Sequence, residues 1–347
     1  MNAKIELVSE VSDMQWSDLL HSSSYSTPFH SKSWIDAWSN AFGYRARYLL
    51  VRDFNGEIIA GMPFMELRYK AWINYESMPW GCYGGVVTRS GTDPEVSESI
   101  LDYFCLIAGR EKVRSAIIVD FFGIMSALGA RCASLQEVYA LVLDTNRPFD
   151  DIYTGYDYSI KKNLRKADRQ NILIRDVGNE IELEEYCLMA DVIAEKYGRK
   201  PYPRQLFLNI YKLMVPREEA KFTMAFLGNK AIAGALHIMN NGHVFNWLTV
   251  SYPETLIYRP VEAVDSNIIE WSCANGYRLY NFGASPINAH SLIKFKEKWG
   301  TKRLPYTIFQ IENKADSFSG LFLSTNLIRR VKNRLKRIVQ SKPNGVA

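Results

Sequence analysis

Two stretches of this chain, YLLVRDFNGEIIAGMPFM at residues 48–65 and FTMAFLGNKAIAGALHIM at residues 222–239, follow one pattern. In each, an apolar run leads through a turn of Gly and Asn into a second apolar run. Such a pattern predicts a β-hairpin, because Asn and Gly supply the positive φ angles that a tight turn needs. The second run also carries one shared string, Ile59-Ala60-Gly61 in the first copy and Ile232-Ala233-Gly234 in the second. The recurrence predicts a duplicated domain.

The segments after each hairpin repeat the order strand, helix, strand. In the first half, apolar spacing predicts a helix over 94–108 and a buried strand over 116–121. In the second half, a strand over 244–250 precedes a helix over 261–275 and a strand over 278–282. Further helices are expected over residues 31–42, 159–170 and 183–197. Strands that alternate with helices in this way predict an α/β chain with mixed sheets covered by helices.

The chain length supports two domains of ordinary size. Its 347 residues are enough for two units that each bury a core. Asn146-Arg147-Pro148 interrupts the strand pattern near the middle, where we place the boundary. We therefore expect an N-terminal domain over 1–150, a C-terminal domain over 151–315 and a basic tail over 316–347.

Composition indicates a folded cytoplasmic protein. Hydrophobic residues make up 47% and charged residues 23%, and the five cysteines are scattered without a C-x-x-C pair. This spacing is typical of buried thiols in a reducing compartment. The N-terminus has no apolar signal-peptide core, and no apolar segment is long enough to span a bilayer. The net charge of +5 is too small to indicate a general nucleic-acid binder.

Several familiar catalytic and metal-binding patterns are missing from the sequence. The five histidines lie far apart and no H-E-x-x-H string occurs, so we expect no metal site. The nucleophile elbow G-x-S-x-G, the P-loop and the dinucleotide fingerprint are also absent. His237 alternates with apolar residues in an expected strand, where a hydrogen-bonded structural histidine is favoured over a catalytic base.

One C-terminal string carries a family resemblance. Phe295-Lys296-Glu297-Lys298-Trp299-Gly300, which follows Tyr280-Asn281-Phe282-Gly283, resembles the F-K-x-x-F/W-G signature of FemAB-like transferases, a branch of the GNAT superfamily. Three further passages are similar to family motifs: Phe29–Trp38, Pro79–Gly85 and the basic segment Lys161–Arg169. The resemblance covers nearly the whole chain.

The resemblance implies two tandem GNAT-like acyltransferase domains with a cleft between them. There an acceptor amine would meet an activated acyl donor. Some relatives use acyl-CoA or an acyl carrier protein to acylate amines of sugar, polysaccharide or other cell-envelope precursors. Others use aminoacyl-tRNA to extend a lipid-linked peptidoglycan precursor. A duplicate without catalytic activity that binds such a precursor as a scaffold is a third possibility.

The resemblance makes Lys296 the candidate catalytic residue. It implies an electrostatic role for this lysine near the reacting carbonyl or a substrate phosphate, because amide formation needs positive charge where an oxyanion develops. The alternative is a solvated lysine on a helix that also bears Lys294 and Lys298. Phe295 and Trp299, four residues apart, would share one helix face as substrate contacts or as core residues.

Candidate binding residues lie in three other segments. Lys161, Arg165 and Arg169 recur every four residues and would grip a diphosphate or tRNA, or form a solvated basic face. Tyr83, among glycines, would line a substrate wall or an irregular turn. Tyr258 and Arg259 precede a helix start and are candidate donor contacts. The GNAT pyrophosphate loop normally has glycines at that point, and this chain has none, which puts standard CoA binding in doubt.

The C-terminal tail is both apolar and basic. Residues 326–339 place apolar side chains at helical spacing among six Arg or Lys residues. Such a helix would lie on an anionic membrane surface as a peripheral contact, or dock on the second domain.

Overall fold

A computed structural model of the chain describes residues 5–109, 113–124, 134–286 and 288–312. They form two compact units. Unit 1 comprises the described residues up to Val138 and from Pro305 onward, and unit 2 comprises Tyr139–Leu304. The proposed tail helix lies outside the described residues. No described helix is long and apolar enough to cross a membrane.

Unit 1 is a mixed sheet with the strand order β1, β2, β3, β4, β6, β13, and β5 pairs with β3. The strands are β1 (Ile5–Val8), β2 (Arg45–Arg52), β3 (Ile58–Arg68), β4 (Ile73–Glu76), β5 (Val87–Thr88), β6 (Val113–Asp120) and β13 (Lys302–Glu312). The helices are α1 (Asp13–Ser22), α2 (Lys32–Phe42) and α3 (Pro94–Ala108), with short 3-10 turns at Pro28–His30 and Pro79–Gly81. The apolar face of α3 packs on β2, β3 and β6 through residues such as Ile100 and Phe104.

The first expected hairpin is confirmed as β2 and β3, and the helix expected over 31–42 is α2. Ser31 caps α2 by accepting a hydrogen bond from the Trp34 amide, and Gly43 ends it in the left-handed region. One detail of the hairpin turn was wrong. Gly56 takes a positive φ of 83°, but Asn55 does not, so the loop is longer than a two-residue turn.

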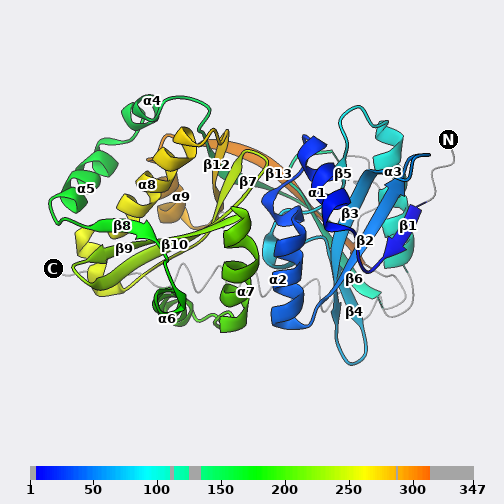
Figure 1. Cartoon of the computed structure of the whole chain (residues 1–347), viewed down its shortest axis with the longest axis horizontal. Helices are drawn as coiled ribbons and strands as arrows, with labels where there is room; N and C mark the ends of the chain where they lie inside the picture. The colour runs from blue at the N-terminus through cyan, green and yellow to red at the C-terminus, as the bar shows by residue number, and fades with distance from the viewer. Residues whose placement is uncertain (1–4, 110–112, 125–133, 287, 313–347) are drawn as a thin grey trace. The chain divides into compact units, whose positions relative to one another are not determined.

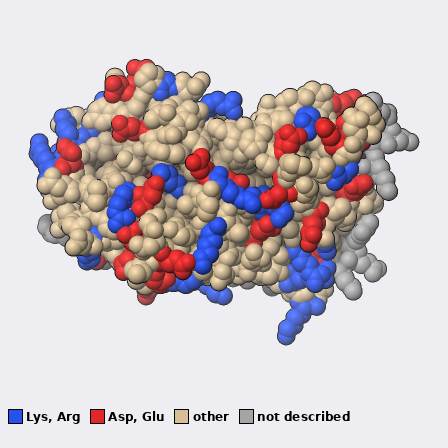
Figure 2. All heavy atoms as spheres, viewed as in Figure 1, with Lys and Arg blue, Asp and Glu red and all other residues tan. Residues whose placement is uncertain are grey.

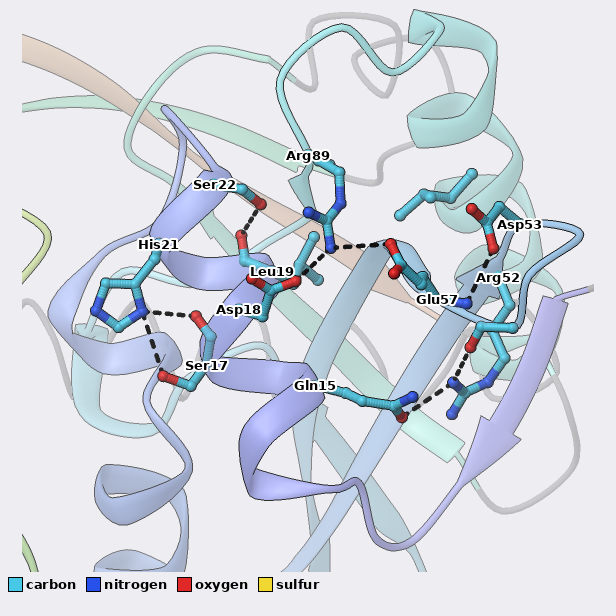
Figure 3. A network of polar contacts seen from close by, with 12 residues as sticks. Gln15, Ser17, Asp18, Leu19, His21, Ser22, Arg52, Asp53, Glu57 and Arg89 are labelled. Carbon is cyan, nitrogen blue, oxygen red and sulfur yellow. Dashed lines mark hydrogen bonds and ion pairs between the residues drawn. The ribbon is translucent and has the colours of Figure 1, made fainter.

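Polar contacts fasten α1 to the β2–β3 turn (Figure 3). The Arg89 guanidinium donates to the Asp18 carboxylate at 2.6 Å and lies 3.9 Å from that of Glu57. Arg52 donates to the Gln15 side chain at 3.1 Å and to the Gly56 carbonyl at 2.8 Å. These exposed and half-exposed contacts orient α1 over β3, where its apolar face is buried.

Unit 2 repeats this plan with the strand order β7, β12, β11, β10, β9, β8. The strands are β7 (Ser134–Asp144), β8 (Leu173–Asp176), β9 (Ala220–Leu227), β10 (Lys230–Asn240), β11 (His243–Ser251) and β12 (Leu279–Ala284). The helices are α4 (Phe149–Thr154), α5 (Tyr158–Asp168), α6 (Glu180–Lys196), α7 (Arg204–Met214), α8 (Pro260–Ala274) and α9 (His290–Glu297), with 3-10 turns at Val215–Arg217 and Pro253–Tyr258. Figure 1 shows α6 and α7 on one face of this sheet and α8, with α5 packed on it, on the other.

The shared Ile-Ala-Gly string has one structural reason in both units. Gly61 and Gly234 sit at the same place in the second strand of each hairpin, beneath an aromatic ring of the covering helix. A Cβ on Gly61 would meet the ring of Trp16 at 2.7 Å, and one on Gly234 would meet Tyr186 at 3.0 Å. Only glycine lets each helix approach its sheet this closely. The repeat therefore records a packing requirement of the duplicated fold.

Candidate active site

Two parallel strands of unit 2 separate partway along their length. β11 and β12 pair only from His243 with Leu279 to Phe245 with Asn281, although β11 continues to Ser251. Beyond the last pair, the next four residues of β11, 246–249, are all half-buried, whichever face of the sheet they are on. Past this point the backbones of β11 and β12 no longer pair with each other.

A bulge at the end of β12 turns its carbonyls out of the sheet. The pairing with β7 shifts register between Asn281 and Ala284. Within the bulge Gly283 has φ 73°, and its N–H donates to the Asn281 side chain at 2.7 Å. A glycine suits this point because other residues disfavour the left-handed region.

The side chain of Lys296 fills the space beside this bulge. From α9 its ammonium donates to the carbonyls of Phe282 at 2.5 Å, Gly283 at 3.2 Å and Ala284 at 3.3 Å. The residue is only 9% exposed. The alternative of a solvated lysine on an amphipathic helix was therefore wrong, whereas Lys294 and Lys298 on the same segment are exposed.

Asp265 on α8 provides the negative charge that faces Lys296. It is 2% exposed, and its Oδ1 accepts a hydrogen bond from the Asn246 side chain of β11 at 3.1 Å. Burial first, and the Glu262 carboxylate second, raise the pKa of Asp265 to about 8, while Lys296 opposes this rise. Burial lowers the pKa of Lys296 to about 8, and Asp265 opposes that fall. Each group therefore keeps its partner closer to the charged form.

Tyr280 and His237 extend the polar chain into the core. The Tyr280 hydroxyl bonds to Asp265 and accepts from Asn246 at 3.1 Å. His237 Nε2 lies 3.1 Å from the same hydroxyl. The imidazole is fully buried, its Nδ1 has no partner, and burial lowers its pKa to about 3. A neutral ring that donates through Nε2 fits these contacts and matches the favoured structural role of His237.

The first turn of α8 carries a buried carboxylate, Glu262. Arg259 precedes the helix in the left-handed region at φ 63°, and Pro260 contributes no N–H. Glu262 is 7% exposed and accepts from Asn163 of α5 at 2.9 Å, while the Arg259 guanidinium lies 3.9 Å away. Tyr258, the other candidate donor contact, is half-buried in the preceding 3-10 turn.

The basic face of α5 points away from the start of α8, because Asn163, which bonds Glu262, lies two residues from both Lys161 and Arg165 and therefore on the opposite side of the helix. Lys161 donates to the Thr154 carbonyl at 2.8 Å, and Arg165 lies over the Tyr158 ring at 5.8 Å. Arg165 and Arg169 are exposed. Their spacing places them on α5 and its C-cap, as expected, and the two interpretations of this face both remain predictions.

The remaining expected site residues lie in two aromatic clusters. In unit 2, Trp299 is fully buried against Tyr156, with ring centroids 4.9 Å apart, and it follows the end of α9 rather than continuing the helix. Phe295 is half-buried beside it. In unit 1, Tyr83 is 3% exposed and stacks on Phe121 at 4.2 Å. Core packing thus accounts for Trp299 and Tyr83.

Sequence reasoning missed most partners of Lys296. Asp265 and Asn246 carry no motif, Tyr280 was noted only as part of the string before the Lys296 motif, and the three come together only when β11, α8 and β12 fold. Among the described residues no group of three or more His, Cys, Asp or Glu side chains could hold a metal ion. On the face seen in Figure 2, acidic and basic side chains are interspersed rather than gathered into one patch.

Comparison with known proteins identifies the fold of both units. Residues 156–291, which contain α5 to α8, β12 and the start of α9, match the family model described as an acetyltransferase (GNAT) domain. No curated protein sequence matches the chain. This match agrees with the expected GNAT-like fold of the second unit.

Solved structures confirm the expected tandem architecture. The crystal structure of FemX is similar at a TM-score of 0.69 and 12% identity, over 87% of this chain and 96% of that one. A tandem GNAT protein from the clavulanic acid biosynthesis pathway is similar at 0.54 and 12%, over 89% and 98%. L-PGS from Bacillus licheniformis is similar at 0.55 and 12%, over 91% and 96%. These likenesses show a FemAB-like tandem GNAT fold.

Proposed function

We propose that this chain, which carries a GNAT acetyltransferase domain, transfers an acyl group from an activated donor to an amine of a cell-envelope or polysaccharide precursor. The observation that carries the proposal is the buried ammonium of Lys296, held at the separated ends of β11 and β12. The nature of the precursor rests on the family resemblance alone.

The chemistry asks little of the protein beyond position and charge. The neutral amine of the acceptor attacks the donor carbonyl, and the carbonyl oxygen takes up negative charge as the C–N bond forms. The bond to the donor's oxygen or sulfur then breaks, the nitrogen loses a proton and the leaving group gains one. We infer that Lys296 stabilises the oxyanion by giving up its contact with Ala284, which at 3.3 Å is the longest of the three.

Asp265 is a positioning residue in this scheme. Its carboxylate faces Lys296 and raises the lysine pKa against the effect of burial. Asn246 and Tyr280 hold that carboxylate from two sides. Loss of Asp265 would leave Lys296 in place but less often protonated near and above pH 8, where the wild-type carboxyl is ionised, because the desolvation would no longer be opposed.

The helix starts favour aminoacyl-tRNA as the second candidate donor. α8 and its counterpart α3 each link two parallel strands, β11 with β12 and β4 with β6. Both helices begin with proline, and both starts carry an acidic side chain: Glu262 in the first turn of α8, and the N-cap Asp93, which accepts from the Glu95 amide at 3.0 Å, in α3. A carboxylate at a helix start disfavours a second anion there, and other GNAT proteins hold the CoA diphosphate at such a start. A donor that does not need a diphosphate site at a helix start, such as an aminoacyl ester of tRNA, suits both units better.

Radiolabelled transfer to an amine acceptor tests the proposal with both donors. Purified full chain would receive labelled acetyl-CoA in one assay and labelled aminoacyl-tRNA, with and without ribonuclease, in another. We expect Lys296→Met to lower the transfer rate about 10²- to 10³-fold, the typical loss for one oxyanion donor. The matched control Lys294→Met removes an exposed lysine of the same helix and keeps the rate. Equal rates in the two variants would exclude the role proposed for Lys296.

A further inference from the structure

We propose that unit 1 carries a second ligand site, for the ammonium group of a small organic amine, formed by the carboxylate of Glu76 and the aromatic rings of Tyr44 and Trp80. The site lies wholly within unit 1 and does not depend on acyl transfer. If the proposed function holds, the amine acceptor is the natural source of such a group.

Glu76 is a half-buried carboxylate that pairs with no cation in the described part of the chain. It ends β4, and its neighbours across the sheet, Met65 of β3 and Ile117 of β6, are apolar. The Trp80 backbone N–H donates to it, and burial raises its pKa to about 7. Among the described residues, no Lys, Arg or His side chain pairs with this carboxylate. A half-buried carboxylate in this setting gains most from an external cation that can also donate hydrogen bonds.

Trp80 and Tyr44, the two residues that interact with this carboxylate, belong to a ladder of aromatic rings. Trp38 and Phe42, one helical turn apart on α2, stack with centroids 4.9 Å apart, and Phe42 stacks on Tyr44 at 5.2 Å. Trp80 lies 6.2 Å from Trp38 and 6.4 Å from Phe42, and it is 44% exposed. Tyr44 is half-buried, and burial first and the charge of Glu76 second raise its pKa. The carboxylate and the ring faces thus present two kinds of cation-binding group on one surface.

The Trp80 ring is held in place at a conformational cost. Its backbone adopts φ 64° and ψ 27°, a region that bulky residues avoid. Its backbone N–H is bound by Glu76, and its indole N–H by the Tyr44 hydroxyl. The strained turn therefore couples the orientation of the exposed indole to both other members of the site.

Another part of the same unit contains a cation–π contact between an arginine and a tryptophan. The Arg114 guanidinium lies 4.5 Å from the centroid of the Trp72 ring, which stacks on Tyr69 at 5.6 Å. One aromatic pair is thus matched with a cation of the chain, whereas Glu76 has no such cation among the described residues.

Fluorine NMR of the full chain tests the site directly. The eight tryptophans would be labelled as 5-fluorotryptophan and the Trp80 signal assigned with Trp80→Phe. Propylammonium chloride would be titrated at pH 8, with 1-propanol as the neutral isostere and sodium chloride at matched ionic strength. We expect a saturable shift of the Trp80 signal with propylammonium alone. In Glu76→Gln, or at pH 5.5 where the carboxyl is protonated, binding should weaken about tenfold, as expected for a lost charged hydrogen bond.

Several outcomes would overturn the site. These are an equal response to 1-propanol, no response at Trp80, or unchanged affinity at pH 5.5. The matched control Glu98→Gln removes an exposed carboxylate of α3 and should bind as the wild type does. If Glu76→Gln fails to fold, the pH comparison on the wild-type chain decides. Acyl transfer without any Trp80 response contradicts this site alone, and a Trp80 response without transfer from either donor contradicts the proposed function alone.

Discussion

Replacing Asp265 with Asn should stabilise unit 2, although Asp265 lies in the candidate active site. The carboxyl pKa rises from an ordinary 3.8 to about 8 on folding. At pH 7 the unfolded chain releases this proton and the folded chain keeps it, which costs at most about 4 kcal/mol of the free energy of unfolding. Asn avoids that cost and retains an oxygen to accept from Asn246. After allowance for imperfect contacts of the new amide, we expect a gain of about 1 to 3 kcal/mol.

The pH dependence separates this effect from a change in packing. Between the two pKa values the folded state binds more protons than the unfolded state, so Asp265 makes the wild type lose stability as pH rises. The advantage of Asp265→Asn should therefore grow by about 3 kcal/mol between pH 5 and pH 7 and level off above pH 8. Urea unfolding followed by tryptophan fluorescence measures this, provided that the transition of unit 2 is fitted separately.

Asp168→Asn, which removes an exposed carboxylate from α5, is the matched control and should show no such slope. The reasoning is refuted if Asp265→Asn is less stable than the wild type at every pH, or if its advantage does not change with pH. A second readout links stability to function. The same variant lowers the pKa of Lys296, so the alkaline limb of its transfer rate should move to lower pH.

Two further predictions concern the fold. Gly61→Ala and Gly234→Ala should each destabilise their unit by about 1 to 3 kcal/mol in urea unfolding, because the new methyl group overlaps the covering ring. In the control Gly109→Ala a Cβ meets only ordinary contacts, so the free energy of unfolding should change by less than about 0.5 kcal/mol. Equal losses at all three sites would contradict the packing argument. Burial lowers the pKa of His30 to about 4, so unit 1 should lose up to about 3 kcal/mol as pH falls from 6.5 to 4. His30→Asn should flatten that slope, and an unchanged slope would place the acid sensitivity elsewhere.

The repeated hairpin and the strand-helix-strand order could be read from the sequence because their signals are local. Turn residues, glycine ends and the spacing of apolar residues act within about ten positions. β1, α1 and α7 were missed, since their apolar residues are few or mixed with charges. Trp299 was placed on a helix by its spacing from Phe295, but α9 ends at Glu297 and the indole packs from the following turn.

The candidate site could be predicted only in part from the sequence, because its residues come from different elements. Helical periodicity places Lys296 with Ile293, on the side of α9 opposite Lys294, but it does not show that the carbonyls at the Gly283 bulge receive the buried ammonium. Asp265 and Asn246 lie on different elements from Lys296, so no local pattern joins them. The resemblance to a family motif identified Lys296, but the carboxylate that sets its charge follows from the fold.

The two units share a plan yet offer different chemistry at corresponding strand ends. β12 ends in a bulge whose carbonyls bind the ammonium of Lys296, whereas β6 ends in the buried carboxylate of Asp120, which accepts from the Gly123 amide at 3.0 Å. Because a carboxylate repels a developing oxyanion and an ammonium attracts it, the two copies cannot serve the same step. Among the described residues, the buried cation lies in unit 2 and the aromatic site with Glu76 lies in unit 1. This division favours chemistry at Lys296 and recognition of an amine by unit 1 as separate tasks, which variants in either unit would affect independently.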